Sequence, residues 1–328
     1  MEVDATPGES GRTPVVKVEL VARRSSRGIW SAVHGLRDAL VAAGVDATIV
    51  ETISRRAPAA HFQLGNSTRP LLLDLARRRG DVVSLHDVVP RNPVVRAALV
   101  AGQRRVLDRH HVVVHTGFAA DLLRGAGFDR PIRVIPHLQP VAPADPERVA
   151  ALRTAWRADD FDAVLVAAGQ LRRHKGLDEL LAAARQHPEV RLVLVGSVSE
   201  RESAAAVATA SANVVHVASP DDDEFCQLIS AADALISLRR TSVGESSGPV
   251  VQAHRLHKPV VGLRVGSLPE LCGPGDVLLD ATADASDLFA AAIAAGLADL
   301  ASGAPQIPDP AAVATAMLAL YDEVGLGR

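Results

Sequence analysis

The loop at residues 169–176, GQLRRHKG, places three fixed cations and a histidine between an apolar run and a helical pattern. The cations are Arg172, Arg173 and Lys175. Cations grouped in this way can neutralise a diphosphate while its bond to carbon breaks, because negative charge develops on the leaving oxygen. An exposed basic turn explains the same residues equally well when the loop is considered alone.

A second loop leads into a helical pattern that begins near Pro249. Proline suits the first turn of a helix, because its missing N–H would have no partner there. Gly248 then lies at the helix start, with the hydroxyls of Ser246 and Ser247 beside it. Free N–H groups, hydroxyls and the positive end of the helix dipole suit a phosphate. An ordinary capped helix start is the alternative, since serine and glycine are common there.

Both loops follow short apolar runs, Ala163–Ala168 and Ala234–Leu238, which favour buried parallel strands. Ligands of open α/β sheets collect outside the carboxyl ends of their strands. We therefore expect the two loops to converge at one edge of one sheet, which strengthens the phosphate interpretation of each.

The first half of the chain also places polar residues where strands are expected to end. Gly65-Asn66 follows the strand Ala60–Leu64, and His86-Asp87 follows Val82–Leu85. A structural hydrogen bond is the alternative for the His-Asp pair. The first loop, residues 23–28, lacks the pattern GxGxxG of dinucleotide-binding folds, although Gly28 could bring backbone close to a ligand. A tight turn with solvated arginines is the alternative there.

Strand and helix patterns alternate almost throughout, which predicts an α/β fold with two doubly wound parallel sheets facing across a cleft. The segment Pro136–Pro146 carries four prolines in eleven residues and is interpreted as the connector. The predicted helices include Pro70–Arg79, Asp284–Leu300 and Pro310–Val324. The expected organisation is a disordered tail at 1–14, a first domain at 15–140, a second domain at 141–308 and a final helical segment at 309–328.

Composition excludes several classes of function. The 328 residues are 48% apolar, enough for two cores, but only 3% aromatic, which disfavours stacking of single-stranded nucleic acid. A net charge of −3 gives no general attraction to nucleic acid or anionic membranes. Two distant cysteines, Cys226 and Cys272, fit a reducing compartment. With no signal peptide and no apolar stretch long enough to span a bilayer, we expect a cytoplasmic protein.

The order of several motifs resembles a known family. The second half reads GxLxxxKG, then LVLVG ending at Gly196, then AADALISL, GESSG at 244–248, and KPVVGLRVGSLPEL. The first half reads QLGNS, LHD, HTGFAADLLRGAG and VIPH. This series resembles retaining glycosyltransferases of family 4, which have the GT-B fold. The resemblance implies a nucleotide-sugar donor on the second domain, an acceptor on the first, no required metal or other cofactor, and a final helix that crosses back to the first domain.

Residue roles follow from the resemblance. Lys175 would bind the donor diphosphate and stabilise the departing nucleotide. The family arginine five positions earlier is Gln170 here, so Arg172 or Arg173 would supply the second cation. Glu245 would approach the donor sugar.

Other positions depart from the family or match it less specifically. The second acidic residue, which meets the ribose, falls at Gln252, one residue closer to Glu245 than usual. His86 resembles the histidine that faces donor sugar and acceptor. Glu270 resembles a family glutamate or caps its own helix.

The resulting expectation groups the residues by role, with no metal ligand among them. The catalytic group is Lys175, Arg172, Arg173, Glu245 and His86; the donor group is Gly169, Gln170, Gly196, Gly244, Ser246, Ser247, Gly248 and Gln252; the acceptor group is Gly28, Asn66 and Asp87.

The resemblance implies a hexosyltransferase-type enzyme that retains anomeric configuration. Few aromatic residues in the first-domain loops Ala22–Trp30 and Val88–Val94 favour a small polar acceptor. The expected partners are a nucleotide sugar and this acceptor, with no nucleic acid, and the oligomeric state stays open. One alternative is a sugar-nucleotide epimerase or hydrolase of the same fold. The other is a non-catalytic sugar-nucleotide-binding protein, suggested by Gln170 and Gln252.

Overall fold

The computed structural model describes residues 16–53, 59–68, 70–91, 96–198, 200–218, 220–296 and 307–326. The expected tail at 1–14 lies outside these residues.

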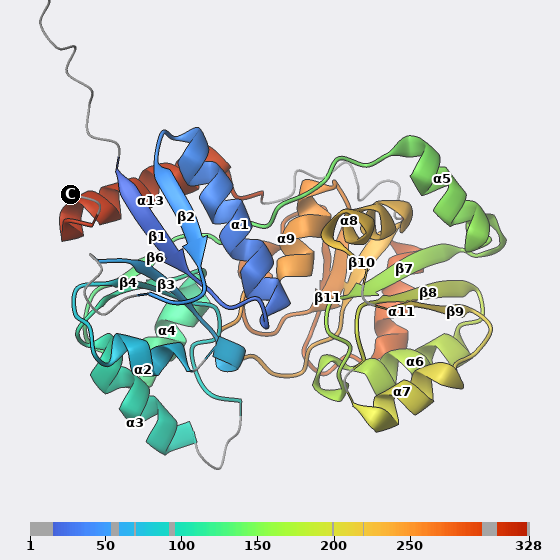
Figure 1. Cartoon of the computed structure of the whole chain (residues 1–328). Helices are drawn as coiled ribbons and strands as arrows, with labels where there is room; N and C mark the ends of the chain where they lie inside the picture. The colour runs from blue at the N-terminus through green and yellow to red at the C-terminus, as the bar shows by residue number, and fades with distance from the viewer. Residues whose placement is uncertain are drawn as a thin grey trace, which may run out of the picture.

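The chain forms two parallel six-stranded sheets, which lie side by side in the molecule (Figure 1). We call each sheet with its covering helices a lobe. The first sheet has the order β2-β1-β3-β4-β5-β6, with β1 Lys17–Val21, β2 Asp46–Val50, β3 His61–Leu64, β4 Val82–Leu85, β5 His111–Val114 and β6 Ile132–Val134.

The second sheet has the order β12-β11-β10-β7-β8-β9. All neighbouring strands in both sheets are parallel, so the predicted pair of doubly wound sheets is confirmed. The strands are β7 Ala163–Ala168, β8 Val190–Val195, β9 Val214–Val217, β10 Ala234–Ser237, β11 Val260–Leu263 and β12 Val277–Leu279.

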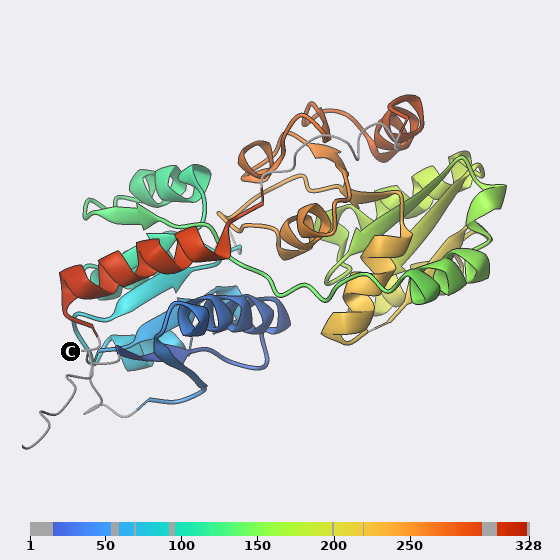
Figure 2. The same cartoon turned by 90° about the horizontal axis from the view of Figure 1, so that it is seen from above.

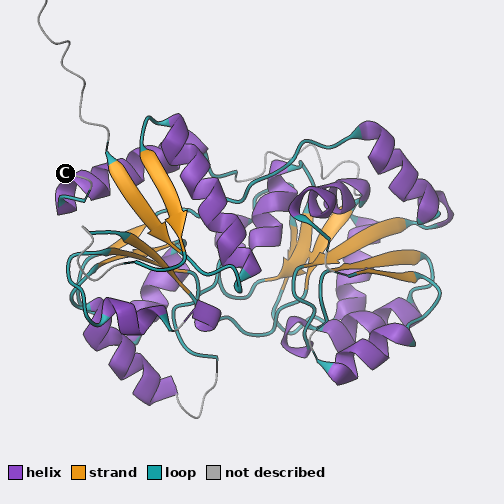
Figure 3. Cartoon of the chain, in the orientation of Figure 1, coloured by secondary structure: helices purple, strands orange, loops and turns teal. Residues whose placement is uncertain are grey.

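Helices cover both faces of each sheet (Figure 3). In the first lobe, α1 (Arg27–Ala42) and α13 (Pro310–Val324) pack on one face, while α2 (Leu71–Leu75), α3 (Arg96–Leu107) and α4 (Gly117–Gly125) pack on the other. In the second lobe, one face carries α6 (Leu177–Gln186), α7 (Arg201–Ala208) and α11 (Ala285–Ala294). Its other face carries α5 (Pro146–Ala155), α8 (Asp222–Ala231), α9 (Gly248–Arg255) and α10 (Leu268–Leu271). Three 3-10 turns are η1 (Asn66–Thr68), η2 (Ala158–Asp160) and η3 (Arg173–Lys175).

Burial on both faces explains why the strands read as continuous apolar runs. Along β7, Leu165 packs into the core beneath α6 and α11, whereas Val164 and Val166 pack into the core beneath α8 and α9. Each face of the sheet thus takes alternate residues of the same short strand. None of the helices in the described part of the chain is both long and apolar enough to span a membrane.

Two predicted helices are too long. The helix predicted at Pro70–Arg79 is α2, which ends at Leu75, because the chain then turns to bring Arg78 against buried Asp81, with Nε 2.9 Å from Oδ2. The helix predicted at Asp284–Leu300 is α11, which ends at Ala294. Gly296 follows with a φ of +57°, a left-handed conformation that ends helices, and residues 297–300 lie outside the described part.

The last helix returns to the first lobe, far from its neighbours in sequence (Figure 2). Helix α13 packs against α1 through Met317, Leu320 and other apolar residues. Tyr321 is fully buried, and its hydroxyl lies 2.7 Å from Nδ1 of His61 on β3. The other nitrogen of His61 lies 2.8 Å from the Ser84 hydroxyl, so the ring is paired on both sides.

Removing the Tyr321 hydroxyl should leave a buried nitrogen of His61 without a partner. We expect Tyr321→Phe to lower the free energy of unfolding by about 1–3 kcal/mol. Urea denaturation measures the change, with Thr315→Ala on the exposed side of α13 as the control. Equal stabilities of the Tyr321→Phe variant and the wild type would show that this contact does not hold the helix.

Candidate functional site

A pocket in the second lobe lies where the strand order reverses. The chain proceeds from β7 to β8 and β9 on one side, then returns to β10, which pairs with the other edge of β7. Such switch points are where open α/β sheets bind ligands. Residues from the ends of β7 and β10, from the loop after β7 and from the start of α9 line this pocket; its polar members include Gln170, Arg172, Lys175, Arg239 and Ser247. The predicted convergence of the two loops is therefore present.

Lys175 lies at the end of the short turn η3, and its Nζ reaches back beside Gly169. Burial lowers the pKa of Lys175 from 10.5 to about 7, together with three neighbouring guanidinium groups. These belong to Arg239, Arg91 and Arg172, while Glu245 acts in the opposite direction. The positive charges around Lys175 therefore outnumber the one carboxylate, Glu245, that offsets them. An anion in the pocket would relieve this repulsion.

Glu245 is buried, and its carboxylate is fully engaged. Oε1 pairs with Arg239 and lies 2.9 Å from Nη2 of Arg91. Oε2 accepts from the Ser242 hydroxyl at 2.9 Å and from the Val243 N–H at 2.6 Å. Burial alone would raise the pKa of Glu245, but the two arginines and the backbone N–H groups lower it to about 2. The carboxylate is therefore charged and orders the cations around it.

The structure separates the two candidate arginines of the first loop. Arg172 lines the pocket, and its buried Nε has no hydrogen-bond partner among the described residues. Arg173 is exposed and pairs with Asp178 at 2.7 Å and with Glu202 at 2.9 Å. Arg172 therefore meets the pocket, and Arg173 lies outside it.

The start of α9 has hydroxyl groups that the described part of the protein does not use. Ser247 precedes the helix without capping it through its side chain, and it lines the pocket. The hydroxyl of Ser246 is buried and has no partner among the described groups. Buried polar groups are normally paired, so the unpaired Ser246 hydroxyl and Arg172 Nε indicate a ligand that brings its own oxygens.

The glycines of the predicted donor group act mainly through close packing. A side chain at Gly196 would lie 2.0 Å from the Gly169 carbonyl, so the two loops can touch only without it. Gly244 has a φ of +91° and lies against Val88 of the first lobe, while Gly248 lies against Gln139 of the connector. The absence of side chains at these glycines allows the Gly169 backbone and the side chains of Val88 and Gln139 to approach them closely.

The predicted first-lobe residues gather at the carboxyl edge of their sheet. The Asp87 carboxylate accepts from the Asn66 N–H at 2.8 Å, and Arg91 approaches it at 3.4 Å. Nε2 of His86 lies 2.9 Å from Oε1 of Gln63. Gly28 lies in the first turn of α1 and not in the loop predicted at residues 23–28, because the helix begins at Arg27.

Gln252 and Glu270 make contacts that the sequence did not predict. The Gln252 side chain is buried and donates to the Pro140 carbonyl of the connector at 3.4 Å, and it is not among the residues that line the pocket. Glu270 does not cap its own helix. It accepts from the N–H groups of Gly117 and Phe118, at 2.7 and 2.5 Å, and so caps α4 in the other lobe.

Sequence reasoning did not single out Arg91 or Arg239. Arg239 directly follows the apolar run of β10, the same signal that drew attention to the loop after β7. Arg91 belongs to a first-lobe loop, and its contact with Glu245 depends on how the lobes meet. No spacing in the sequence reveals that contact.

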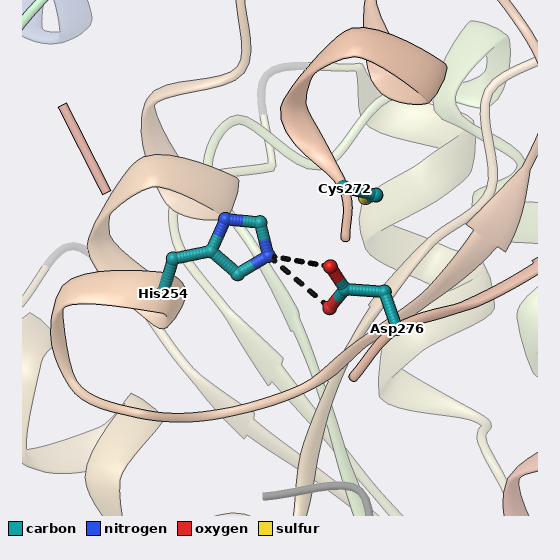
Figure 4. Close-up of side chains that lie close together, drawn as sticks. All are labelled: His254, Cys272 and Asp276. Atoms are coloured by element: carbon teal, nitrogen blue, oxygen red, sulfur yellow. Dashed lines mark hydrogen bonds and ion pairs between the residues drawn. The ribbon is translucent and has the colours of Figure 1, made fainter. Parts of the chain in front are cut away.

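One buried group in the described part of the chain has the residue types of a metal site (Figure 4). It consists of His254, Cys272 and Asp276, but hydrogen bonds already use the carboxylate. Asp276 accepts from the Val260 N–H at 2.7 Å and the Gly273 N–H at 2.8 Å, and it lies 3.1 Å from His254 Nε2. Burial and Asp276 raise the pKa of the Cys272 thiol, so it stays protonated and donates to the same carboxylate. The cluster is therefore a hydrogen-bonded link between α9, α10 and β12.

The comparisons with known proteins agree with this architecture. Residues 150–301 match the family model described as Glycosyl transferases group 1. Similar solved structures include HepE of Anabaena in complex with UDP-glucose, with a TM-score of 0.73 and 16% identity over 94% of this chain and 100% of that chain. Sucrose-phosphate synthase of Thermosynechococcus elongatus gives a TM-score of 0.71 and 18% identity over 94% and 99%. A glycosyltransferase of Rickettsia africae gives 0.69 and 12% over 97% and 100%. No curated protein sequence matches this chain.

The chain therefore has the GT-B fold, as the motifs led us to expect, and the family match covers most of its second lobe. The pocket at the β7–β10 switch point lies within the matched residues.

The hydrogen-bonded interpretation of the Asp276 cluster predicts that neither zinc nor a chelator changes the thermal stability of the protein. Asp276→Asn should lower the free energy of unfolding by about 1–3 kcal/mol, because the amide replaces an acceptor by a donor. Asp280→Asn, at an exposed position beyond β12, serves as the control. A rise in melting temperature with stoichiometric zinc would contradict this interpretation.

The depressed pKa of Lys175 makes a prediction about stability and pH. Below pH 7 the folded protein holds a buried charge, whereas between about pH 7 and 10.5 only the unfolded chain binds that proton. Stability that depends on Lys175 therefore rises with pH across this window. We expect ligand-free Lys175→Met to be more stable than the wild type at pH 6, with the difference shrinking towards pH 10. Denaturation at several pH values tests this, and a difference that does not vary with pH would refute it.

Proposed function

We propose that this protein is a glycosyltransferase that moves a sugar from a nucleoside-diphosphate sugar to an acceptor hydroxyl. One observation carries the proposal: a pocket at the switch point of the second sheet combines Lys175, Arg172 and Arg239 with one nearby buried carboxylate. Such an excess of buried positive charge suits a dianionic ligand, and a diphosphate supplies the required oxygens. The family match of residues 150–301 and the UDP-glucose bound to HepE of Anabaena support the nucleotide sugar.

The reaction breaks the bond between the anomeric carbon and the phosphate oxygen and forms a bond from that carbon to the acceptor oxygen. The nucleoside diphosphate leaves with the electron pair, and the acceptor proton passes to it. Lys175 and Arg172 would hold the charge that develops on the leaving oxygen. The start of α9, with the Ser246 and Ser247 hydroxyls, would hold the phosphate or the sugar. Glu245 would keep the arginines oriented and approach the sugar hydroxyls.

We further propose the finer properties that the resemblance implies: membership of family 4, retention of anomeric configuration, and cleavage without a required metal. The cation cluster supports the last of these, since fixed side-chain charges occupy the place where a metal would neutralise the diphosphate. The anomeric configuration of the glycoside product, measured by NMR and compared with that of the donor sugar, tests retention directly.

Binding of nucleoside diphosphates is the first test of the proposal. We expect one of UDP, GDP, ADP or dTDP, and its sugar, to raise the melting temperature, because a ligand that binds only the folded state stabilises it. Magnesium should not be needed. Lys175→Met should weaken this binding by roughly 10- to 100-fold through loss of a charge-assisted hydrogen bond.

Arg173→Met is the matched control, since it removes a cation two residues away that lies outside the pocket. It should leave the Kd of the same nucleotide unchanged. Failure of every nucleotide to bind well-folded protein would end the proposal. Binding followed by conversion of the nucleotide sugar without any acceptor would instead favour an epimerase or hydrolase.

A further inference from the structure

Three histidine rings lie together on the first lobe. His86, His115 and His137 directly follow β4, β5 and, after two residues, β6. The ring centres of His86 and His115 are 4.6 Å apart, those of His115 and His137 are 5.4 Å apart, and those of His86 and His137 are 6.3 Å apart. Because adjacent parallel strands bring their carboxyl ends to one edge, the three rings form a continuous patch, which we call the histidine cluster.

The segments that carry the histidine cluster meet the second lobe. Each histidine stands two residues before a contact with that lobe. The contacts are the Val88 N–H to the Val243 carbonyl at 2.8 Å, the Gly117 N–H to Glu270 at 2.7 Å, and Arg255 Nη1 to the Gln139 carbonyl at 2.9 Å. The loop that carries Glu245 thus lies opposite the cluster.

Polar atoms of the cluster lack partners among the described residues. Nδ1 of His115 lies 2.9 Å from the Ile135 carbonyl, which can only accept, so Nδ1 carries the hydrogen. In a neutral ring Nε2 then holds a lone pair, and this nitrogen is buried and unpaired. Nδ1 of His137 and the amide nitrogen of Gln63, which contacts His86, are also buried and unpaired. Such groups normally find a partner in the working protein.

Burial favours the neutral form of all three rings. Burial lowers the pKa of His115 to about 4, and burial with repulsion from His115 lowers that of His137 to about 3. Burial and the other rings lower the pKa of His86 well below its ordinary value. The residues His115 and His137 are only 7% and 6% exposed, so solvent does little to support a charge on their rings. The cluster therefore offers hydrogen bonds without attracting anions.

We propose that the histidine cluster binds an uncharged, hydroxyl-bearing ring of the acceptor, such as a sugar or a polyol. The lone pair on His115 Nε2 requires a donor, which a hydroxyl supplies and which a carboxylate or an ionised phosphate oxygen does not. The Gln63 amide supplies a donor in return, so a hydroxyl that both donates and accepts fits the pair. The identification of this ring as the acceptor rests on the proposed function, whereas the hydroxyl site itself does not.

Histidine-ring NMR on the full chain tests the inference without any reaction. Ring-nitrogen-labelled protein, with and without UDP, is titrated with methyl α-glucoside and myo-inositol, and then with glucose 6-phosphate and inositol 1-phosphate. We expect an uncharged probe to shift Nε2 of His115 and the ring of His137. The phosphate of the same sugar or polyol should bind at least about tenfold more weakly, because an ionised phosphate oxygen cannot donate to the lone pair of His115 Nε2.

The decisive variant is His137→Leu, because the His137 ring makes no hydrogen bond to the described residues and its loss should not disturb the fold. We expect it to melt at or above the wild-type temperature and to bind the uncharged probe about tenfold more weakly. His115→Phe is the second variant. His110→Gln is the control, since His110 stands at the opposite end of β5 with both nitrogens paired. It should bind the probe as the wild type does.

The outcomes separate the two proposals. Protein that binds a nucleotide but shows no polyol shift at either ring overturns the histidine site and leaves the transferase proposal standing. Polyol binding at the cluster in protein that binds no nucleotide supports the site and ends the transferase proposal. Tighter binding of the phosphorylated probes at these rings, or unchanged affinity in His137→Leu, also overturns the inference.

Discussion

The buried carboxylate of Glu245 is the point at which the two lobes and the charged pocket meet. It pairs with Arg239 from its own lobe and Arg91 from the other, and it accepts from the Val243 N–H. Without this anion, Arg239 and Lys175 would lose the carboxylate beside them, and Arg91 would keep only its contact with Asp87. Proteins rarely tolerate uncompensated charge in buried places. The ion pair thus keeps the cations in place and joins the lobes at the pocket.

The parallel topology explains why the chemistry collects where it does. In each lobe the loops that follow the strands emerge on one edge, and the two edges face each other through the contacts of Val88, Glu270 and Gln139. The close packing of Gly196 on Gly169 lets two loops of the second lobe share that edge. Backbone geometry therefore fixes the pocket before any ligand arrives.

The sequence was sufficient for the sheets and for the second-lobe side of the site. The apolar run of β7 is buried on both faces, so its ends were easy to locate, and the charged loop that follows had to lie at the ligand edge. Lys175 and Arg172, which line the pocket, were predicted in this way, and Ser247 was predicted from the helix start that follows β10. Arg91 could not be found, because its contact with Glu245 crosses the lobe interface. The resemblance assigned Gln252 to the ribose, although Gln252 lies one residue closer to Glu245 than the family's acidic residue does. In the structure its side chain donates to the Pro140 carbonyl of the connector.

Buried polar groups that lack suitable partners lie on both sides of the interface between the lobes. The second lobe holds a lysine whose pKa is near neutrality and the unpaired Nε of Arg172, while the first holds neutral histidines with unpaired nitrogens. Each group costs stability in the protein alone, and a different ligand chemistry would relieve each: an anion on one side and hydroxyls on the other. A nucleotide sugar that reaches from the cations towards Glu245 would present its sugar between the two. Charged groups on one side of the interface and neutral groups on the other would therefore orient such a donor, with its phosphates in the second lobe and its reactive carbon facing the first.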